Sequence, residues 1–107
     1  MAEERTLAAV RYLKGRLRRS GLRVSKAVLF GSHARGEATP DSDIDVAVIS
    51  EGFRGKDLFE RGELVGGAHR AAVRKFLLPF DIVTLTPEEF ESEESLVAQF
   101  AKEGVVL

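Results

Sequence analysis

The sequence predicts an α+β fold, in which α-helices flank a β-sheet. Three runs have the length and composition of β-strands, at residues 23–30, 44–49 and 80–85. Apolar residues near the N-terminus instead recur at helical spacing, at Leu7, Val10, Leu13 and Leu17. With 107 residues the chain can bury one hydrophobic core, and we expect a single domain over residues 1–107.

The first half of the chain predicts one helix and two strands. The apolar stripe places a helix over residues 3–20, and Ser20-Gly21 ends it. The strand at 23–30 then leads directly into Gly31. Residues 44–49 are apolar except at Asp45, which is typical of a strand that is covered on both faces. We therefore expect that strand to be central in the sheet.

The second half predicts three helices and two strands. A loop at 52–55 precedes a helix over 56–76, whose glycines each cost about 1 kcal/mol relative to alanine and mark a break or close helix packing; they are Gly62, Gly66 and Gly67. The strand at 80–85 follows. Thr86 and Pro87 then start a short helix, since threonine caps helices and proline suits the first turn. A further helix is expected over 93–102, and residues 105–107 are expected to add a terminal strand.

Composition excludes several classes of function. The chain has no cysteine, which rules out disulfides and thiolate chemistry. Its N-terminus is acidic where a signal peptide is basic, and no apolar run reaches the roughly 20 residues that cross a bilayer. We therefore expect a soluble cytoplasmic protein.

The net charge of −1 hides an asymmetry between the two ends of the chain. Arginine and lysine dominate residues 1–26, whereas residues 86–107 hold six glutamates against Lys102 alone. Two solvated helix faces explain this pattern. Nucleic-acid binding is not favoured, because Tyr12 is the single aromatic residue among the basic ones that could stack on a base.

Three aspartates form a candidate metal site. Asp43 and Asp45 have strand spacing, so their side chains project together while Ile44 and Val46 face the opposite layer. Two such carboxylates repel each other unless a cation holds both ionised. Asp81 opens the strand at 80–85, so three acids could meet around a divalent metal such as Mg²⁺. A bare Asp-x-Asp more often caps a turn or reaches solvent, so the flanking residues must decide.

The turn before these acids is suited to phosphate binding. Gly31 to Gly36 has the outline of a P-loop, but Glu37 stands where the lysine would follow, which excludes the Walker motif. What remains is a glycine directly after a strand, which lets backbone amides approach a phosphate, with the Ser32 hydroxyl as a further donor at the start of a short helix. Arg35 either contacts a phosphate or pairs with a neighbouring acid, Asp41 or Glu37.

Other polar and aromatic residues have simpler expected roles. We expect His33 to be exposed to solvent, since it is poorly placed to activate its neighbour Ser32. Ser42 is expected to order the turn before Asp43, and His69 to lie at the surface or in an interface. The phenylalanines are expected in the core, among them Phe30, Phe76, Phe80 and Phe100.

The combined pattern resembles a known family. Gly31-Ser32-x-Ala34-Arg35-Gly36, then Ser42-Asp43-x-Asp45 and the lone acid Asp81, is similar to the motif of the DNA polymerase beta-like nucleotidyltransferase superfamily. More narrowly, the chain resembles the minimal nucleotidyltransferases, the MNT proteins that act as antitoxins beside HEPN-domain toxins. The resemblance covers nearly the whole chain and implies the nucleotidyltransferase fold, with a mixed β-sheet flanked by α-helices.

The resemblance also implies a reaction, the transfer of AMP from ATP with two Mg²⁺ ions. In that reaction Asp43 and Asp45 would bind both ions, and Asp81 would bind the one beside the acceptor and take the acceptor's proton. Gly31 and Ser32 would hold the outer phosphates of ATP, with Arg35 as a further nucleotide contact. The implied acceptor is a tyrosine hydroxyl on a partner HEPN toxin.

Two other functions stay open at this point. The chain could be an antitoxin that neutralises its toxin by binding alone, as part of a hetero-oligomer. It could also be the catalytic subunit of a nucleotidyltransferase for a small molecule or an RNA end, with a separate subunit that binds the acceptor. The acceptor stays open as well, and the chain could form a homo-oligomer or a hetero-oligomer.

Overall fold

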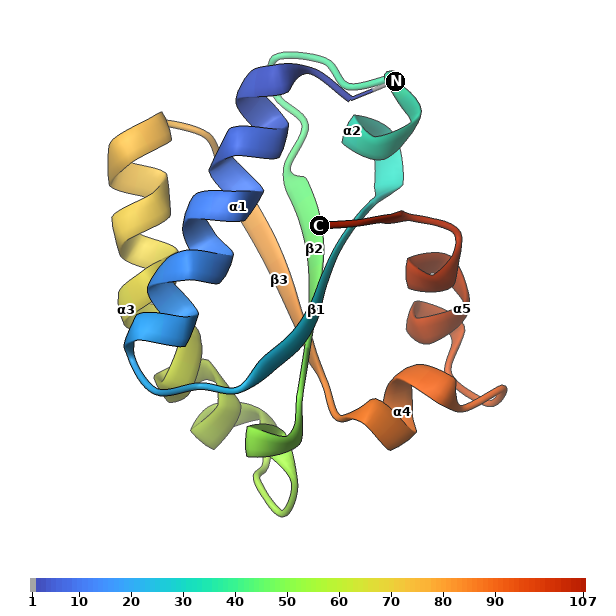
Figure 1. The fold of residues 1–107 in the computed structure, drawn as a ribbon. Coiled ribbons are helices and arrows are strands. Elements are labelled where there is room, and N and C mark those ends of the chain that lie inside the picture. The colour runs from blue at the N-terminus through green and yellow to red at the C-terminus, as the bar shows by residue number, and fades with distance from the viewer. Residues whose placement is uncertain (1) are drawn as a thin grey trace.

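A computed structural model describes residues 2–107 as three layers built on one four-stranded sheet (Figure 1). The strand order is β3-β2-β1-β4. The strands are β1 (Val24–Phe30), β2 (Ile44–Ser50), β3 (Phe80–Leu85) and β4 (Val105–Val106). Strand β1 runs antiparallel to β2 and β4, whereas β2 and β3 are parallel. The fold is therefore α+β with a mixed sheet, as the sequence predicts.

Helices cover both faces of this sheet (Figure 1). Helices α1 (Glu4–Arg19) and α3 (Leu58–Phe76) lie on one face, and α4 (Pro87–Glu91) and α5 (Leu96–Lys102) lie on the other. The short helix α2 (Gly31–Arg35) follows β1 directly, and a 3₁₀ turn (Glu51–Phe53) follows β2.

The side chains of β2 alternate between two hydrophobic clusters. Ile44, Val46 and Val48 pack in the cluster that α1 and α3 close, whereas Ala47 and Ile49 pack in the smaller cluster of α4 and α5. This alternation follows from strand geometry, in which successive side chains point to opposite faces. The predicted central position of this strand is confirmed.

Capping residues set where the later helices begin. Helix α3 starts after residue 56, the predicted start, because Asp57 caps it in a reciprocal pair with Glu60: each side chain accepts from the other's backbone N–H, at 2.8 and 3.0 Å. Helix α5 starts at Leu96 and not at residue 93, because the Ser95 hydroxyl accepts a hydrogen bond from Ala98 N at 3.1 Å.

The glycines of α3 do not have the roles expected of them. The helix runs unbroken through Gly62, Gly66 and Gly67. A Cβ added at Gly62 or Gly67 would meet no atom within 4 Å. A Cβ at Gly66 would lie 3.1 Å from Nη1 of Arg70 on the same helix. The three glycines therefore mark no break and no close contact with another helix.

The start of α4 is as predicted. The Thr86 hydroxyl caps the helix by accepting from Glu89 N, Pro87 occupies the first turn, and the Glu89 carboxylate accepts from Thr86 N at 2.8 Å. The Glu89 carboxylate also accepts from Arg61, which is only 8% exposed, at 2.7 Å. This ion pair joins α3 to α4 across the end of β3, where Arg61 also donates to the Thr84 carbonyl oxygen.

The expected core positions of the phenylalanines are only partly correct. Phe80 is buried, and Phe30 and Phe76 are half-buried against the clusters. Phe100 is 56% exposed, because α5 turns the small side chains of Ala98 and Ala101 toward the sheet. Among residues 2–107, no helix has the length and apolar composition needed to span a membrane.

Candidate active site

The predicted site residues lie at the end of the sheet where β1 finishes and β2 and β3 begin (Figure 1). Asp45 on β2 is paired in register with Phe30 on β1 and with Asp81 on β3. Adjacent strands therefore place Asp45 and Asp81 side by side in one row.

The two carboxylates lie on the face of the sheet that α4 and α5 cover. Their strand neighbours Ile44 and Phe80 pack on the α1–α3 side, and residues two positions further along, Ala47 and Val83, pack on the α4–α5 side. Side chains two residues apart share a face, so Asp45 and Asp81 point to the α4–α5 side.

Asp43 lies just before β2 and not on it. The strand begins with Ile44, whose N–H donates to the Pro79 carbonyl oxygen at 2.8 Å. Asp43 and Asp81 are exposed, whereas Asp45 is half-buried. The structure thus places two carboxylates at the solvent boundary and one beneath them.

The three aspartates interact electrostatically. Burial raises the pKa of Asp45, and the negative charges of Asp81 and Asp43 raise it further, while His33 and Arg35 act weakly in the opposite direction. The ionised form of Asp45 is therefore disfavoured. A cation bound here would reverse that effect.

The donor chemistry of these residues fits Mg²⁺. Among residues 2–107, no three carboxylate, imidazole or thiol side chains are close enough together to enclose a metal ion by themselves. Mg²⁺, however, usually takes one or two carboxylates and completes its coordination with waters and substrate phosphates. The assignment of Asp43, Asp45 and Asp81 as ligands stays a prediction.

Gly31 is in direct contact with Asp45. Its φ of +75° lies in the left-handed region that favours glycine. A Cβ at Gly31 would lie only 3.1 Å from Cγ of Asp45 and even closer to the carboxylate oxygen Oδ2. The turn after β1 therefore needs glycine both for its conformation and for the space that Asp45 occupies.

The neighbours of Gly31 are placed by α2. Ser32 is half-buried in the first turn, and its carbonyl oxygen accepts from Glu37 N at 2.9 Å. Arg35 donates from Nε to Glu37 Oε1 at 3.2 Å on an exposed surface, which is one of the two roles that the sequence left open for it. The nucleotide contacts predicted for Gly31, Ser32 and Arg35 stay predictions.

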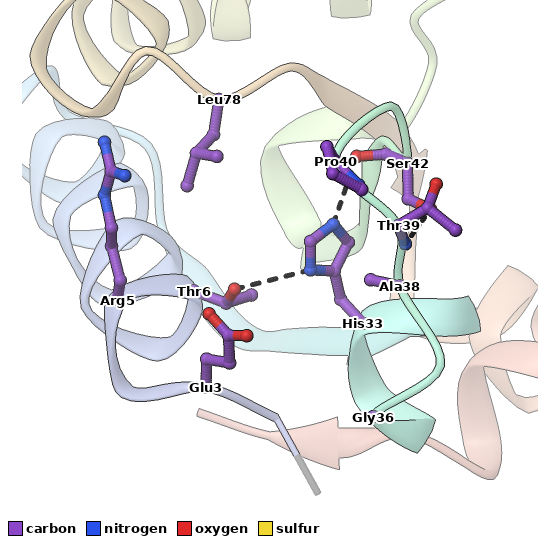
Figure 2. Close-up of a pocket in the computed structure, with 10 residues that line it drawn as sticks. All are labelled: Glu3, Arg5, Thr6, His33, Gly36, Ala38, Thr39, Pro40, Ser42 and Leu78. Carbon is purple, nitrogen blue, oxygen red and sulfur yellow. Dashed lines mark hydrogen bonds between the residues drawn. The ribbon is translucent and has the colours of Figure 1, made fainter.

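Two cavities flank α2. One of about 370 Å³ lies on the α5 side and is lined by Phe30, Gly31, Ala34, Arg35, Phe100, Glu103 and Gly104. The other, of about 340 Å³, lies on the α1 side (Figure 2). None of the three aspartates lines either cavity. Sequence reasoning missed Phe100 and Glu103 as cavity residues, since the apolar residues of α5 occur all round the helix and do not indicate which face is buried.

His33 is not the solvent-exposed residue that was expected. It is half-buried, its Nε2 lies 3.1 Å from the Ser42 carbonyl oxygen, and its Nδ1 lies 3.4 Å from the Thr6 hydroxyl (Figure 2). Ser42 does order the turn before Asp43, as expected, because its hydroxyl accepts from Thr39 N at 2.9 Å. His69 is half-buried at the edge of the Phe80 ring.

The mixed sheet with helices on both faces makes this an α+β protein, and the family match identifies the nucleotidyltransferase fold. The chain belongs to the nucleotidyltransferase domain family, whose model matches residues 10–107. No curated protein matches the chain at a significant level.

Solved structures share this architecture. A candidate nucleotidyltransferase from Sulfolobus solfataricus is 22% identical with a TM-score of 0.63, and the match covers 97% of this chain and 86% of that one. A candidate minimal nucleotidyltransferase is 26% identical with a TM-score of 0.59, over 100% of this chain and 95% of that one.

A third similar structure carries a different name. The BolA domain of SufE1 from Arabidopsis thaliana is 20% identical with a TM-score of 0.53, and the match covers 83% of this chain and 99% of that one. The layer arrangement alone therefore does not specify an activity, and function has to be argued from the site.

Proposed function

We propose that this protein is a Mg²⁺-dependent nucleotidyltransferase that transfers AMP from ATP to a tyrosine hydroxyl of a partner HEPN-domain toxin, and so acts as an antitoxin. The observation that carries the transferase part is the row of carboxylates: Asp45 and Asp81 lie in register on one face, with Asp43 close enough to raise the pKa of Asp45. The toxin partner and the tyrosine acceptor rest on the resemblance to MNT proteins.

In the proposed reaction the acceptor oxygen bonds to the α-phosphorus of ATP. The bond between that phosphorus and the bridging oxygen breaks, and pyrophosphate leaves. Asp43 and Asp45 would hold two Mg²⁺ ions, and Asp81 would hold one of them and accept the hydroxyl proton. When bound, Mg²⁺ makes the acceptor a better nucleophile and stabilises the leaving pyrophosphate.

The nucleotide would be held from the β1 side of the row. Gly31 brings backbone against Asp45, and α2 begins at Gly31, so its first-turn amides and the Ser32 hydroxyl come next along the chain. These groups would bind the outer phosphates, with the Arg35 guanidinium as an added positive charge once it leaves Glu37. The leaving group then departs on the side away from Asp81, as in-line displacement requires.

The test is intact-mass spectrometry of the HEPN-domain toxin that the proposal requires as partner, after incubation with the purified protein, ATP and Mg²⁺. We expect whole AMP units on the toxin with the wild-type chain, and none with Asp43→Asn, Asp45→Asn or Asp81→Asn. Asp41→Asn is the matched control, because Asp41 is an exposed turn residue outside the carboxylate row. Full transfer by a folded variant that carries all three substitutions, the triple aspartate variant, would refute the metal assignment.

A second candidate function is neutralisation of the toxin by binding alone. It is favoured by an exposed apolar surface on α5 and β4, formed by Leu96, Val97, Phe100, Val105 and Val106. An apolar surface of this kind suits a protein partner.

The two functions differ in stoichiometry. A transferase silences excess toxin at substoichiometric amounts, provided ATP is present, whereas a binding antitoxin needs equal amounts and works without ATP. Neutralisation by the triple aspartate variant at equal protein ratio would favour binding. If the toxin stays unmodified and active, a screen of RNA ends and small hydroxyl compounds would test the remaining transferase alternative.

A further inference from the structure

His33 connects two segments that are distant in sequence. Its ring lies between Thr6 on α1 and the Ser42 carbonyl oxygen in the loop before β2 (Figure 2). The loop itself is exposed from Glu37 to Asp41. The histidine thus fixes the far end of an exposed loop to a helix of the core.

The two hydrogen-bond partners decide which ring nitrogen of the neutral imidazole carries the hydrogen. A backbone carbonyl can only accept, so Nε2 must carry the hydrogen and donate to Ser42. Nδ1 then has a lone pair, and the Thr6 hydroxyl donates to it. Both ring nitrogens have a partner, and the orientation of the ring is fixed.

Both partners are themselves held in place. Thr6 is only 3% exposed, on a helix whose Val10 and Leu13 are fully buried. Ser42 makes three hydrogen bonds with Thr39. Its N–H donates to the Thr39 carbonyl oxygen at 3.0 Å, its hydroxyl accepts from Thr39 N at 2.9 Å, and the two hydroxyl oxygens lie 3.2 Å apart. The connection therefore runs from the core through His33 into an ordered turn.

Asp43 lies between two such attachments. On one side the Ser42 carbonyl oxygen accepts from His33, and on the other Ile44 N donates to Pro79. The His33 ring contacts the Ser42 carbonyl oxygen from the side of the loop where Thr6 of α1 lies, and the Asp43 side chain stays exposed. We infer that His33 is a positioning residue that holds Asp43 for metal binding, an inference that rests on the proposed function.

The test uses two amides that replace different nitrogens of the ring. In His33→Gln the longer side chain retains a donor near the position of Nε2 and can reach Ser42. In His33→Asn the shorter side chain reaches only the Thr6 side. The two variants match in polarity and differ in whether they hold the loop.

The first readout is Mg²⁺ binding, measured as the rise in Tm with added MgCl₂ at saturating ATP. The midpoint is the Mg²⁺ concentration that gives half of the full rise in Tm. For His33→Asn we expect it to increase about tenfold, which is the lower end of the loss in metal affinity when a supporting contact is removed. For His33→Gln we expect it to stay within about twofold of the wild-type value. A purely structural role would lower the metal-free Tm and leave the midpoint unchanged.

The second readout needs no metal. Hydrogen exchange at the Ser42 amide is expected to become faster in His33→Asn and to stay at the wild-type rate in His33→Gln. Equal midpoints and equal exchange in the two variants would overturn the role of His33 and leave the proposed function intact. A wild-type chain whose Tm does not respond to Mg²⁺ and ATP would overturn the proposed function and, with it, this role.

Discussion

At the scale of single residues, the charge of Asp45 opposes folding. Its pKa is raised in the folded protein, first by burial and then by Asp81 and Asp43. The folded state therefore binds a proton at Asp45 more tightly than the unfolded chain does. Above the raised pKa the ionised carboxylate destabilises the fold, and the effect disappears below the unfolded value of about 3.9.

Asp45→Asn should consequently be more stable than wild type at pH 7 in the absence of metal. The difference in Tm should shrink as the pH falls through the raised pKa and vanish below about pH 4. Thermal unfolding in EDTA from acid to neutral pH measures this, with the exposed Asp41→Asn as control. A variant that is less stable than wild type at pH 7 would contradict the assignment of a repulsive site.

Gly31 offers a matched comparison with Gly55. Both have a positive φ, of +75° and +74°, but a Cβ at Gly55 would meet no atom within 4 Å. Gly55→Ala should therefore lower the free energy of unfolding by about 1 kcal/mol, through backbone strain alone. Gly31→Ala should lower it by roughly 1–3 kcal/mol more, because Asp45 must also move. Urea unfolding gives both values, and equal losses would argue against the contact with Asp45.

The residues of the carboxylate row were predictable, whereas the support of Asp43 was not. Asp43, Asp45, Asp81 and Gly31 stand next to apolar strand runs, so local spacing indicates where they lie. His33 and Thr6 are 27 positions apart, and their contact depends on how α1 packs against α2. No local pattern carries that information.

At the scale of the elements, glycines make α3 less stable than a helix of the same length with alanine at those positions. Two of its glycines, Gly62 and Gly67, are exposed and have free space where a Cβ would be. Gly62→Ala and Gly67→Ala should each raise the free energy of unfolding by about 0.5–1 kcal/mol, because alanine restricts the unfolded chain and favours helix. Chemical denaturation measures this free energy. A loss of stability in either variant would mean that the added methyl group clashes with a neighbouring residue.

The ion pair of Arg61 and Glu89 joins α3 to α4. The hydrogen bond from Arg61 lowers the pKa of Glu89, so the pair stabilises the fold above the unfolded glutamate value of about 4.3 and loses this effect as the pH falls through the lowered pKa. Glu89→Gln should cost about 1–2 kcal/mol at pH 7, less than a fully buried pair because the Glu89 side chain is 44% exposed.

Glu91→Gln on the same short helix is the control for Glu89→Gln, since Glu91 is exposed at the end of α4. Denaturant midpoints at pH 7 and in acid separate the two variants. A cost for Glu89→Gln that stays the same in acid would mean that the capping contact with Thr86, and not the charge, supports α4.

Element prediction succeeded where one pattern dominates. The range of β3 was predicted correctly from its apolar composition, and α4 from Thr86 and Pro87. The helix α5 was also predicted, with its end at Lys102, but its start and its buried face were not. Leu96, Val97 and Phe100 have the same apolar character as the residues that the helix buries. Which side of such a helix meets the sheet is decided by the space left beside it, a tertiary property.

At the scale of the whole molecule, the two faces of the sheet are unequally covered. Helix α1 buries Val10, Leu13 and Leu17 among other residues, whereas α5 buries only the small side chains of Ala98 and Ala101. Since stabilisation follows the apolar area removed from water, the α5 layer should open at a lower free energy than the α1 layer, by about 1–3 kcal/mol.

Native-state hydrogen exchange measures that difference. Amides of α5 should exchange through a local opening, while those of α1 and β2 should exchange only on global unfolding. The amides of α3, on the well-covered face, serve as the internal reference. Identical opening free energies for α1 and α5 would show that the two layers unfold as one unit.

The thin cover over the carboxylate face has an evolutionary consequence. Phe100 of α5 lines the cavity beside Gly31, and Leu96 and Val97 are exposed on the same helix, where they contribute little to the core. Substitutions at Leu96 or Val97 can therefore accumulate with little loss of stability while they alter the surface that a visiting molecule meets. A lineage built on this scaffold can change this surface without having to rebuild the scaffold itself.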